Sequence, residues 1–334
     1  MFIDSFKKLS FEELCDKLCE NKRTLIIYHV RPDADAVGSA FALQELLGYM
    51  GIPAICACED EVPARLAFLS EDVQGSVLLD DEILLGHERV ISIDAASPQQ
   101  LGSLFNRLHK DIDLMIDHHA EGKVYADNYV RPEAAATGEI IFDIAKYLLE
   151  KGRIGMISER VYGCIYAAIS SDTGCFKYAN VTSATHRYAA ELVETGIDTA
   201  EINHRLFESK TLKQLKAEGE AARRLIVYEG GRVAAVTFPY SSKFSLGLGD
   251  DHLETIIDIP RSIAGVEVAF VVKQPTEDKC FRVSMRSNCN FDVSAVCAKF
   301  GGGGHARAAG CSLTAGGIHE AEEAILEAVR ELMK

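Results

Sequence analysis

The sequence predicts an α/β protein: a doubly wound, mostly parallel sheet, followed by a second, smaller α/β domain. In the first half, short apolar runs alternate with helical patterns, which is typical of such a sheet. The chain has 334 residues, and domains usually hold about 100–200, so two domains are expected. With 48% hydrophobic and 25% charged residues, the composition is that of an ordinary globular protein.

The strand and helix patterns of the first half follow one another in order. Right-handed crossovers would bring the carboxyl ends of the strands to one edge, where doubly wound sheets bind ligands. We read the N-terminal residues 1–20 as an amphipathic helix, not a signal peptide. The expected strands are 24–29, 53–57, 89–95 and 113–119, and the expected helices are 36–51, 138–152 and 160–172.

The second half begins with a polar, helix-forming stretch. We expect a first domain over 1–182, a helical connector over 183–224 and a second domain over 225–334. The EGG turn at 229–231 separates two apolar runs and predicts a β-hairpin. Strands over 266–274 and 280–287 and a C-terminal helix over 319–334 complete this domain.

Composition limits which cellular compartment and which binding partners are expected for this protein. Ten scattered cysteines without a C-x-x-C pair favour reduced thiols in a cytoplasmic protein. The sequence has no run of 18 apolar residues, so no membrane span is predicted. A net charge of −15 argues against a complex with long nucleic acid. Residues 261–310 hold seven Lys and Arg against four acids, so a small anion could be bound locally.

Four separated segments place Asp or His where a strand ends or a helix begins. Taken singly, each has a simpler interpretation, such as Asp35 as a helix N-cap and Asp33 as a turn residue. Two adjacent histidines after an apolar strand are harder to explain as packing, since neutral imidazole is a good ligand for Mn, Fe, Co or Zn. The segments are His29-x-x-x-Asp33-x-Asp35, Asp94, Asp117-His118-His119 and Asp172-Thr173-Gly174.

Together, these oxygen and nitrogen donors suit two divalent metal ions. The set is poor in sulfur, which favours Mn²⁺, with Fe²⁺, Co²⁺ or Mg²⁺ as alternatives. Two such ions can share a carboxylate, activate a water molecule and neutralise phosphoryl oxygens during in-line displacement. The sequence therefore predicts a two-metal phosphoesterase.

In this order, the segments resemble the DHH phosphoesterase superfamily, whose signature is the triplet seen here as Asp117-His118-His119. The N-terminal motif H-x-x-P-D-x-D-A-x-G-S matches residues 29–39, with Ala34 where Gly is common. The resemblance implies one metal on His29, Asp33 and Asp94. It implies a second metal on Asp35, His118 and Asp172, with Asp94 bridging. His119 would face the scissile phosphate, and Asp117 would orient a ligand histidine.

The second domain resembles the DHHA1 domain through the run GGGGHARAAG at 301–310, preceded by Arg286 and Ser287. Glycines allow backbone amides to approach an anion closely and to form a nest for it. The residues that we expect to bind substrate are Arg286, Ser287, Gly302, Gly303, Gly304 and His305.

The compact two-domain form is similar to the NrnA-like family of nanoRNases and 3′-phosphoadenosine 5′-phosphate (pAp) phosphatases. The resemblance implies hydrolysis of short RNA, linear dinucleotides such as pApA, or pAp to 5′-mononucleotides. A RecJ-like single-strand exonuclease and a cyclic-dinucleotide phosphodiesterase are the enzyme alternatives, and a metal-loaded nucleotide sensor is the non-enzyme one. The apolar first domain is also a candidate for homodimerisation.

Overall fold

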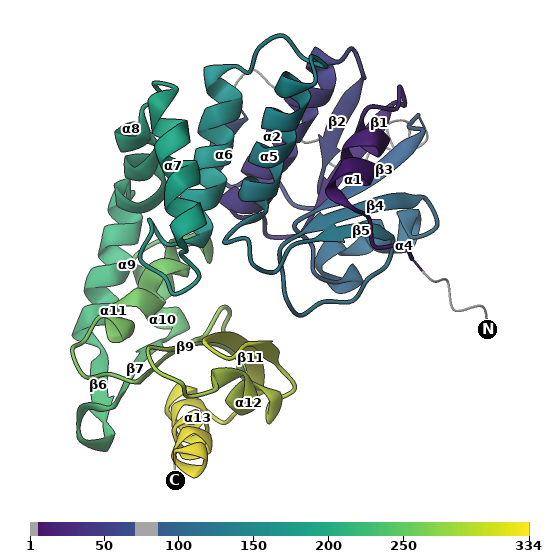
Figure 1. Cartoon of the computed structure of the whole chain (residues 1–334). Coiled ribbons are helices and arrows are strands. Elements are labelled where there is room, and N and C mark those ends of the chain that lie inside the picture. The colour runs from purple at the N-terminus through teal and green to yellow at the C-terminus, as the bar shows by residue number, and fades with distance from the viewer. Residues whose placement is uncertain (1–5, 71–85, 334) are drawn as a thin grey trace. The chain divides into compact units, whose positions relative to one another are not determined.

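The computed structural model describes residues 6–70 and 86–333 and divides the chain into two compact units, Met1–Ser209 and Lys210–Lys334 (Figure 1). The helices and strands of the first unit are α1 (Phe11–Leu18), β1 (Thr24–Tyr28), α2 (Ala34–Tyr49), β2 (Ala54–Ala57), η1 (Ala64–Leu69), β3 (Arg89–Ile93), η2 (Pro98–Leu101), α4 (Ser103–Leu108), β4 (Ile112–Asp117), β5 (Asp127–Val130), α5 (Thr137–Glu150), α6 (Glu159–Asp172), α7 (Ser183–Glu194), α8 (Thr199–Asn203) and η3 (His204–Glu208).

The first unit is built on a parallel sheet of five strands in the order β2-β1-β3-β4-β5. This confirms the predicted fold class and the four predicted strands, while β5 was not predicted. The strand order reverses between β1 and β3, which is the switch point where ligands bind in such sheets. Helix α1 confirms the N-terminal helix only over Phe11–Leu18: residues 6–10 are not helical, because the chain enters the helix at the N-cap Ser10, and residues 1–5 lie outside the described residues.

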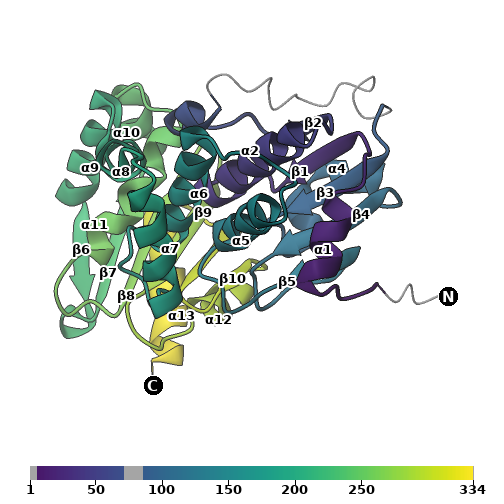
Figure 2. The same ribbon diagram turned by 45° about the horizontal axis from the view of Figure 1, so that its top comes forward.

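Both faces of this sheet are buried, which explains why its strands read as continuous apolar runs. Alternate residues of β1 show the division, because Ile26 and Tyr28 face one core and Leu25 and Ile27 the other. The first core lies beneath α1, α2, α5 and α6, and Figure 2 shows α2, α5 and α6 side by side over the sheet. The second core is closed by η2 and α4.

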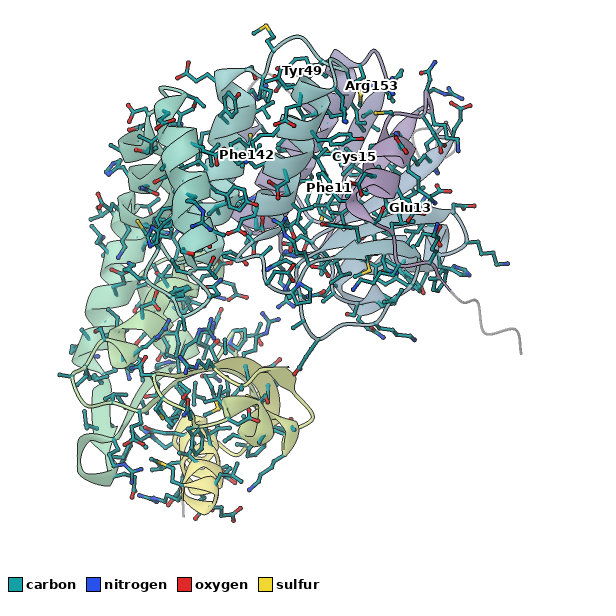
Figure 3. The ribbon with its side chains drawn as sticks, viewed as in Figure 1. Phe11, Glu13, Cys15, Tyr49, Phe142 and Arg153 are labelled. Atoms are coloured by element: carbon teal, nitrogen blue, oxygen red, sulfur yellow. The ribbon has the colours of Figure 1, made fainter. Side chains whose placement is uncertain are left out.

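Aromatic contacts join the helices of the first unit. The ring of Phe142 on α5, labelled in Figure 3, meets Tyr162 of α6 and Tyr188 of α7 edge-on, with centroids 6.2 and 5.9 Å away. Phe11 of α1 meets Tyr147 of α5 edge-on, with centroids 5.6 Å apart. Such edge-to-face pairs stabilise the packing by more than the burial of their apolar surface, and their preferred ring geometry favours a fixed angle between the helices.

The second unit holds a mixed sheet of six strands in the order β10-β11-β9-β8-β7-β6. β6 and β7 form the predicted hairpin around residues 229–231. β10 and β11, which carry most of the glycine-rich run, were not predicted as strands. The elements of this unit are α9 (Leu212–Arg223), β6 (Leu225–Tyr228), η4 (Glu229–Gly231), β7 (Val233–Phe238), α10 (Tyr240–Ser245), η5 (Asp251–Leu253), η6 (Thr255–Ile257), α11 (Asp258–Arg261), β8 (Val268–Lys273), β9 (Cys280–Ser287), α12 (Val293–Ala298), β10 (Gly303–His305), β11 (Ala308–Thr314) and α13 (Ile318–Leu332).

The stretch 183–224 that we predicted as a connector is helical and has two packing partners. Helix α7 packs on α5 and α6 of the first unit, whereas α9 packs on β7 of the second. The role of this stretch as a connector stays a prediction. No helix in the described parts of either unit has both the length and the apolar character that a membrane span needs.

Close packing of three helices depends on two glycines of the first unit. A β-carbon on Gly38 of α2 would lie 2.4 Å from the carbonyl oxygen of Cys164 on α6. A β-carbon on Gly138 of α5 would lie 2.7 Å from the β-carbon of Ala168, also on α6. These contacts bring the middle of α6 against the first turns of α2 and α5, close to the acids of the predicted site.

We predict that Gly38→Ala destabilises the protein by about 1–3 kcal/mol, because the added methyl group overlaps a backbone carbonyl that cannot turn away. Gly48→Ala is the matched control, since it lies on the same helix with no atom within 4 Å of its added β-carbon. That variant should gain up to about 1 kcal/mol from helix propensity. Urea unfolding of both variants measures the difference, and equal stabilities would refute the packing role of Gly38.

Candidate metal centre

The predicted site residues of the first unit follow the carboxyl ends of three adjacent strands. In the sheet, Tyr28 is paired with Ile93 and Ile93 with Ile116, so these strands end nearly level. His29 follows β1 and Asp94 follows β3, on either side of the switch point, while Asp117 ends β4. The crossover helices supply the remaining acids, with Asp35 in the first turn of α2 and Asp172 as the last residue of α6.

The structure brings the six predicted metal ligands together in two groups of donors. In the first group, Nε2 of His29 lies 3.7 Å from a carboxylate oxygen of Asp33 and 3.7 Å from one of Asp94. In the second, Nε2 of His118 lies 3.3 Å from Asp172 and 3.7 Å from Asp35. The other carboxylate oxygen of Asp94 lies 3.7 Å from the same Nε2 of His118, so Asp94 joins the groups.

Backbone carbonyls orient both of these histidines. Nδ1 of His29 lies 2.9 Å from the carbonyl oxygen of Val30, and Nδ1 of His118 lies 3.2 Å from that of Ala134. A carbonyl can only accept, so each Nδ1 carries a proton, and Nε2 is the nitrogen that can serve as a ligand when a metal takes the place of its proton. This is the tautomer that a metal-binding histidine needs.

Asp35 is fully buried and held by three donors. Its carboxylate accepts hydrogen bonds from the backbone amides of Thr137 and Gly138, at 2.7 and 2.9 Å, and from the hydroxyl of Ser39 at 3.0 Å. The amides belong to the first turn of α5, where free N–H groups and the helix dipole favour an anion. The hydroxyl of Thr137 donates to Asp94 at 3.0 Å, so a single helix terminus positions two acids.

Asp33 is the N-cap of α2, with one carboxylate oxygen accepting from the amides of Asp35 and Ala36. This reverses the simpler interpretation of the sequence, in which Asp35 was the cap and Asp33 the turn residue. Ala34 is the first residue of α2 and does not have a left-handed φ, so this position does not require glycine.

Backbone strain is concentrated in the loops of this site. Five non-glycine residues in the described parts of the chain have a left-handed φ, and four of them lie in the predicted motifs or directly after Gly174. Asp94 itself has a φ of 53°. Such residues cost about 1–3 kcal/mol each and persist where the surrounding structure holds them, often at functional sites. The four are Arg31, Asp94, Cys175 and Phe176.

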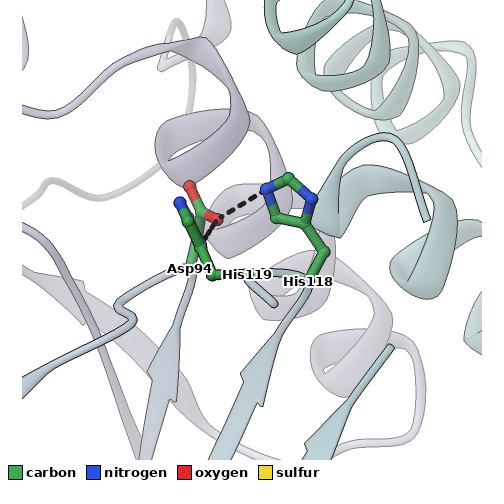
Figure 4. Close-up of side chains that lie close together, drawn as sticks. All are labelled: Asp94, His118 and His119. Atoms are coloured by element: carbon green, nitrogen blue, oxygen red, sulfur yellow. Dashed lines mark ion pairs between the residues drawn. The ribbon is translucent and has the colours of Figure 1, made fainter. Parts of the chain in front are cut away.

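Asp117 contacts His119, which differs from our expectation that it orients a ligand histidine. One oxygen of Asp117 lies 2.7 Å from Nδ1 of His119 and also accepts from the amides of His118 and His119. The side chains of His118 and His119 both approach Asp94, as Figure 4 shows. Asp117 therefore fixes the ring of His119, and the carbonyl of Ala134 orients His118 instead.

The nearby carboxylates raise the pKa values of the two histidines. Burial opposes the charged form of His29, but Asp33 and Asp94 outweigh it and raise its pKa to about 11. For His118, the contacts with Asp172 and then Asp35 likewise overcome burial and raise the pKa to about 11.

The carboxylates respond differently to the same surroundings. Burial, followed by the neighbouring Asp94, raises the pKa of Asp35 well above its ordinary value. Burial also raises the pKa of Asp172, to about 6. In contrast, the histidines overcome burial at Asp94 and lower its pKa to about 2. Four acids around two imidazoles leave an excess of negative charge that divalent cations would neutralise.

These residues fit a pair of divalent metal ions. The donors are carboxylate oxygens and imidazole nitrogens, which suit Mn²⁺ and similar ions, and cysteine sulfur is absent from the clusters found in the described chain. Nε2 of His118 is buried and has no hydrogen bond to any described residue, which would be costly without a ligand. Divalent metals are thus consistent with the donor set, and which metal binds is not determined by it.

Two family models match the chain, the DHH family N-terminal domain over residues 23–169 and the DHHA1 domain over 231–334. The chain belongs to the DHH–DHHA1 family. Among its relatives is the bifunctional oligoribonuclease and PAP phosphatase NrnA of Thermus thermophilus, with 28% identity over 92% of this chain and 89% of that protein. NrnA of Bacillus subtilis is 29% identical over 87% of this chain and 89% of that protein.

The fold is shared with a solved relative. An exopolyphosphatase-related protein from Bacteroides fragilis superposes with a TM-score of 0.88 and 22% identity, over 97% of this chain and 98% of that one. The predicted recognition and fold class are therefore confirmed. The residue roles within this DHH–DHHA1 chain rest on its own geometry.

In the DHHA1 domain, Arg286 and Ser287 end β9 but differ in environment. Arg286 is partly exposed and donates one hydrogen bond to the carbonyl of Met285 at 2.9 Å. Ser287 is 2% exposed, and its hydroxyl donates to the carbonyl of Cys289 at 3.0 Å. Ser287 thus shapes the turn after β9, and Arg286 is the better candidate for contact with substrate.

The glycine-rich run of the DHHA1 domain has a different structure from the anion nest that we expected. The amide of Gly302 donates to the carbonyl of Cys297 at 2.9 Å, which closes the end of α12. A β-carbon on Gly302 would lie 2.3 Å from the carbonyl oxygen of Gly310, so this glycine allows β10 to approach β11. Gly303 and Gly304 are exposed in β10, and the side chain of His305 lies outside the described structure.

Three residues that position the acids were missed as site residues. Ser39 lies four residues after Asp35 on α2, so its hydroxyl faces the same side of the helix. That spacing could have been recognised in the motif. Thr137 and Gly138 lie about a hundred residues further on, and nothing in their local sequence links them to Asp35.

We predict that Asp94→Asn removes most of the bound divalent metal, since Asp94 contacts both donor groups. Asparagine tolerates a left-handed φ, so the loop should keep its conformation. Elemental analysis of the purified variant measures metal content, and circular dichroism checks the fold. Asp111→Asn, at an exposed position, is the control. A folded Asp94→Asn protein with two ions per chain would contradict the bridging role.

Proposed function

We propose that this protein is a two-metal phosphoesterase that hydrolyses very short RNA, linear dinucleotides such as pApA, and pAp to 5′-mononucleotides. The observation that carries this proposal is the pair of donor groups joined by Asp94 at the switch point of the sheet. The NrnA relatives, which are named as oligoribonucleases and PAP phosphatases, support the choice of substrate because the similarity extends over most of both chains.

The residues have distinct proposed roles. His29, Asp33 and Asp94 would hold one ion, and Asp35, Asp94, His118 and Asp172 the other, with Mn²⁺ as the favoured metal. When bound, the ions would activate a water molecule and neutralise the phosphoryl oxygens. His119 approaches the metal centre without belonging to the two groups proposed as ligands. We assign His119 the role of donating a hydrogen bond to the scissile phosphate.

Asp117 supports that role of His119. Burial disfavours the imidazolium of His119, but the hydrogen bond with Asp117 outweighs it and raises the pKa. With Nδ1 donating to Asp117, Nε2 is the nitrogen left for substrate. Arg286 in the second unit would bind a terminal phosphate, since a guanidinium forms charge-assisted hydrogen bonds with phosphate oxygens.

The alternatives differ in what they need from the chain. A RecJ-like exonuclease would process long single strands, which a net charge of −15 disfavours. A nucleotide sensor would bind metal and ligand without turnover, but it would have no use for the Asp117–His119 pair. A cytoplasmic location and homodimer formation remain part of the proposal. A panel of pAp, pApA, pGpG, short RNA, long single-stranded DNA, cyclic di-AMP and pyrophosphate, assayed with Mn²⁺, distinguishes the proposed activity from the enzyme and sensor alternatives.

We predict that activity in this panel is highest for pAp and for oligonucleotides of two to about four residues, because the acidic surface repels longer polyanions. Release of AMP from pApA, followed by chromatography, is the direct measurement. Processive digestion of long single strands would favour the RecJ-like alternative, and binding of pApA without AMP release would favour the sensor.

We predict that Asp117→Asn lowers kcat by about 10–100-fold while metal content stays the same, because it removes the negative charge that favours the imidazolium of His119 without removing a proposed ligand. His119→Ala should lower kcat by a similar factor, and the double variant should be little worse than either single one. Steady-state kinetics with metal analysis tests this. Additive losses in the double variant would show that Asp117 acts independently of His119.

A further inference from the structure

One face of the sheet in the second unit carries an unusual set of side chains. Along β8, Val268, Phe270 and Val272 face the core beneath α12 and α13, so Lys273 points to the opposite face. On that opposite face, α9, η6 and α11 pack over β7 and β8. The strands β9 and β11 present partly or fully exposed residues there: Arg282, Ser284 and Arg286 from β9, and Ala308, Gly310 and Ser312 from β11.

Lys273 and Arg282 are direct cross-strand neighbours in the register of β8 and β9. Side chains at such positions have β-carbons about 4.5–5.5 Å apart, and like charges there are destabilising. Arg286 lies on the same face four residues further along β9. Three cations thus share a small area of a protein whose net charge is −15.

Lys273 lacks the hydrogen bonds and ion pairs that a partly buried ammonium group normally forms within the described residues. It is only partly exposed, and it makes no hydrogen bond or ion pair with the residues that the structure describes. Burial lowers the pKa of Lys273. Asp250 and Glu254 oppose this shift, whereas the two arginines on the same face reinforce it.

Asp250, one of the two acids that act on Lys273, already forms ion pairs with two other cations. Its oxygens contact Nζ of Lys243 at 2.5 Å and Nη1 of Arg282 at 3.5 Å. Asp250 therefore leaves much of the positive charge uncompensated. Such an arrangement is stabilised when an anion binds, because phosphate can accept hydrogen bonds from an ammonium and a guanidinium at once.

The neighbouring strand carries small residues. Beside Arg286, Ser284 and Arg282 of β9, the paired positions on β11 are Ala308, Gly310 and Ser312. Small residues along one strand and donors along the next would allow a chain of nucleotides to lie along this face, between Arg286 at one end and Arg282 at the other. Arg282 and Arg286 are four residues apart, so their α-carbons are separated by about 13 Å.

We propose that Lys273 and Arg282 form a second phosphate subsite in the second unit, along β9 from Arg286. This subsite binds an additional phosphate of oligonucleotides longer than a dinucleotide. The choice of an oligonucleotide as ligand rests on the proposed function, in which Arg286 binds a terminal phosphate. Dinucleotides and pAp would be bound without contacts to Lys273 and Arg282. The subsite therefore determines how strongly the affinity for an oligonucleotide increases with the number of its nucleotides.

Calorimetric titration of the full-length protein tests this. Chelator is added to prevent turnover, and the ligands are pAp and 5′-phosphorylated di-, tri- and tetra-adenylates. Lys273→Gln should weaken binding of the tri- and tetranucleotides about tenfold, the loss expected for one charge-assisted contact. Binding of pAp and the dinucleotide should change less than about twofold. For the trinucleotide, the slope of log K against log salt should fall by about 0.7.

The matched control is Lys279→Gln, which removes the same charge from an exposed position just before β9. It should leave the length dependence unchanged. If Lys273 and Arg282 bind one phosphate, the double variant Lys273→Gln/Arg282→Gln should lose less affinity than the two single losses combined. Equal weakening of every ligand, or the same effect from Lys279→Gln, would overturn the subsite.

Thermal unfolding separates a binding role from a structural one. Lys273→Gln relieves a like-charge pair, so its Tm should equal or exceed that of the wild type. A lowered Tm together with a uniform loss of affinity would assign Lys273 to structure and overturn the proposal. Because binding is measured without turnover, the subsite can stand even if Mn²⁺ assays release no AMP. That result would reject only the proposed function.

Discussion

The first unit is organised around the repulsion among four carboxylates that its fold brings together. Asp33, Asp35, Asp94 and Asp172 come from three segments and meet where three strands end. Two imidazoles supply only part of the positive charge that they need. Oriented backbone offsets a further part: the amino end of α5 donates to Asp35, and the first turn of α2 donates to Asp33. The carboxyl end of α6, in contrast, offers Asp172 no favourable dipole.

Much of this arrangement could be predicted from the sequence. Apolar runs that end in His29 and Asp94 indicated parallel strands with polar carboxyl ends, and the parallel sheet then required those ends to meet. The donor types indicated divalent metal. These inferences succeed because they depend on local patterns together with one topological rule.

Other features could not be read from the chain. Thr137 and Gly138 contact Asp35 only because α5 begins beside α2, and this contact arises from tertiary packing. Strand β5 was missed because four residues with a mixed polar and apolar pattern give a weak signal. The glycine-rich run was not predicted to form strands, although Gly302 permits close pairing of β10 with β11. In each case, the deciding contact joins residues that the local sequence does not relate.

The glycines at the helix crossings have a consequence for how such a centre can change. Because Gly38 and Gly138 fix how closely α6 approaches α2 and α5, the distance between Asp172 and Asp35 is set by the framework and not by the loops. Loop sequences can therefore diverge, and alter which esters are accepted, while the spacing of the acids stays constant. Adapting the centre to a cation of another radius would instead require repacking these helices.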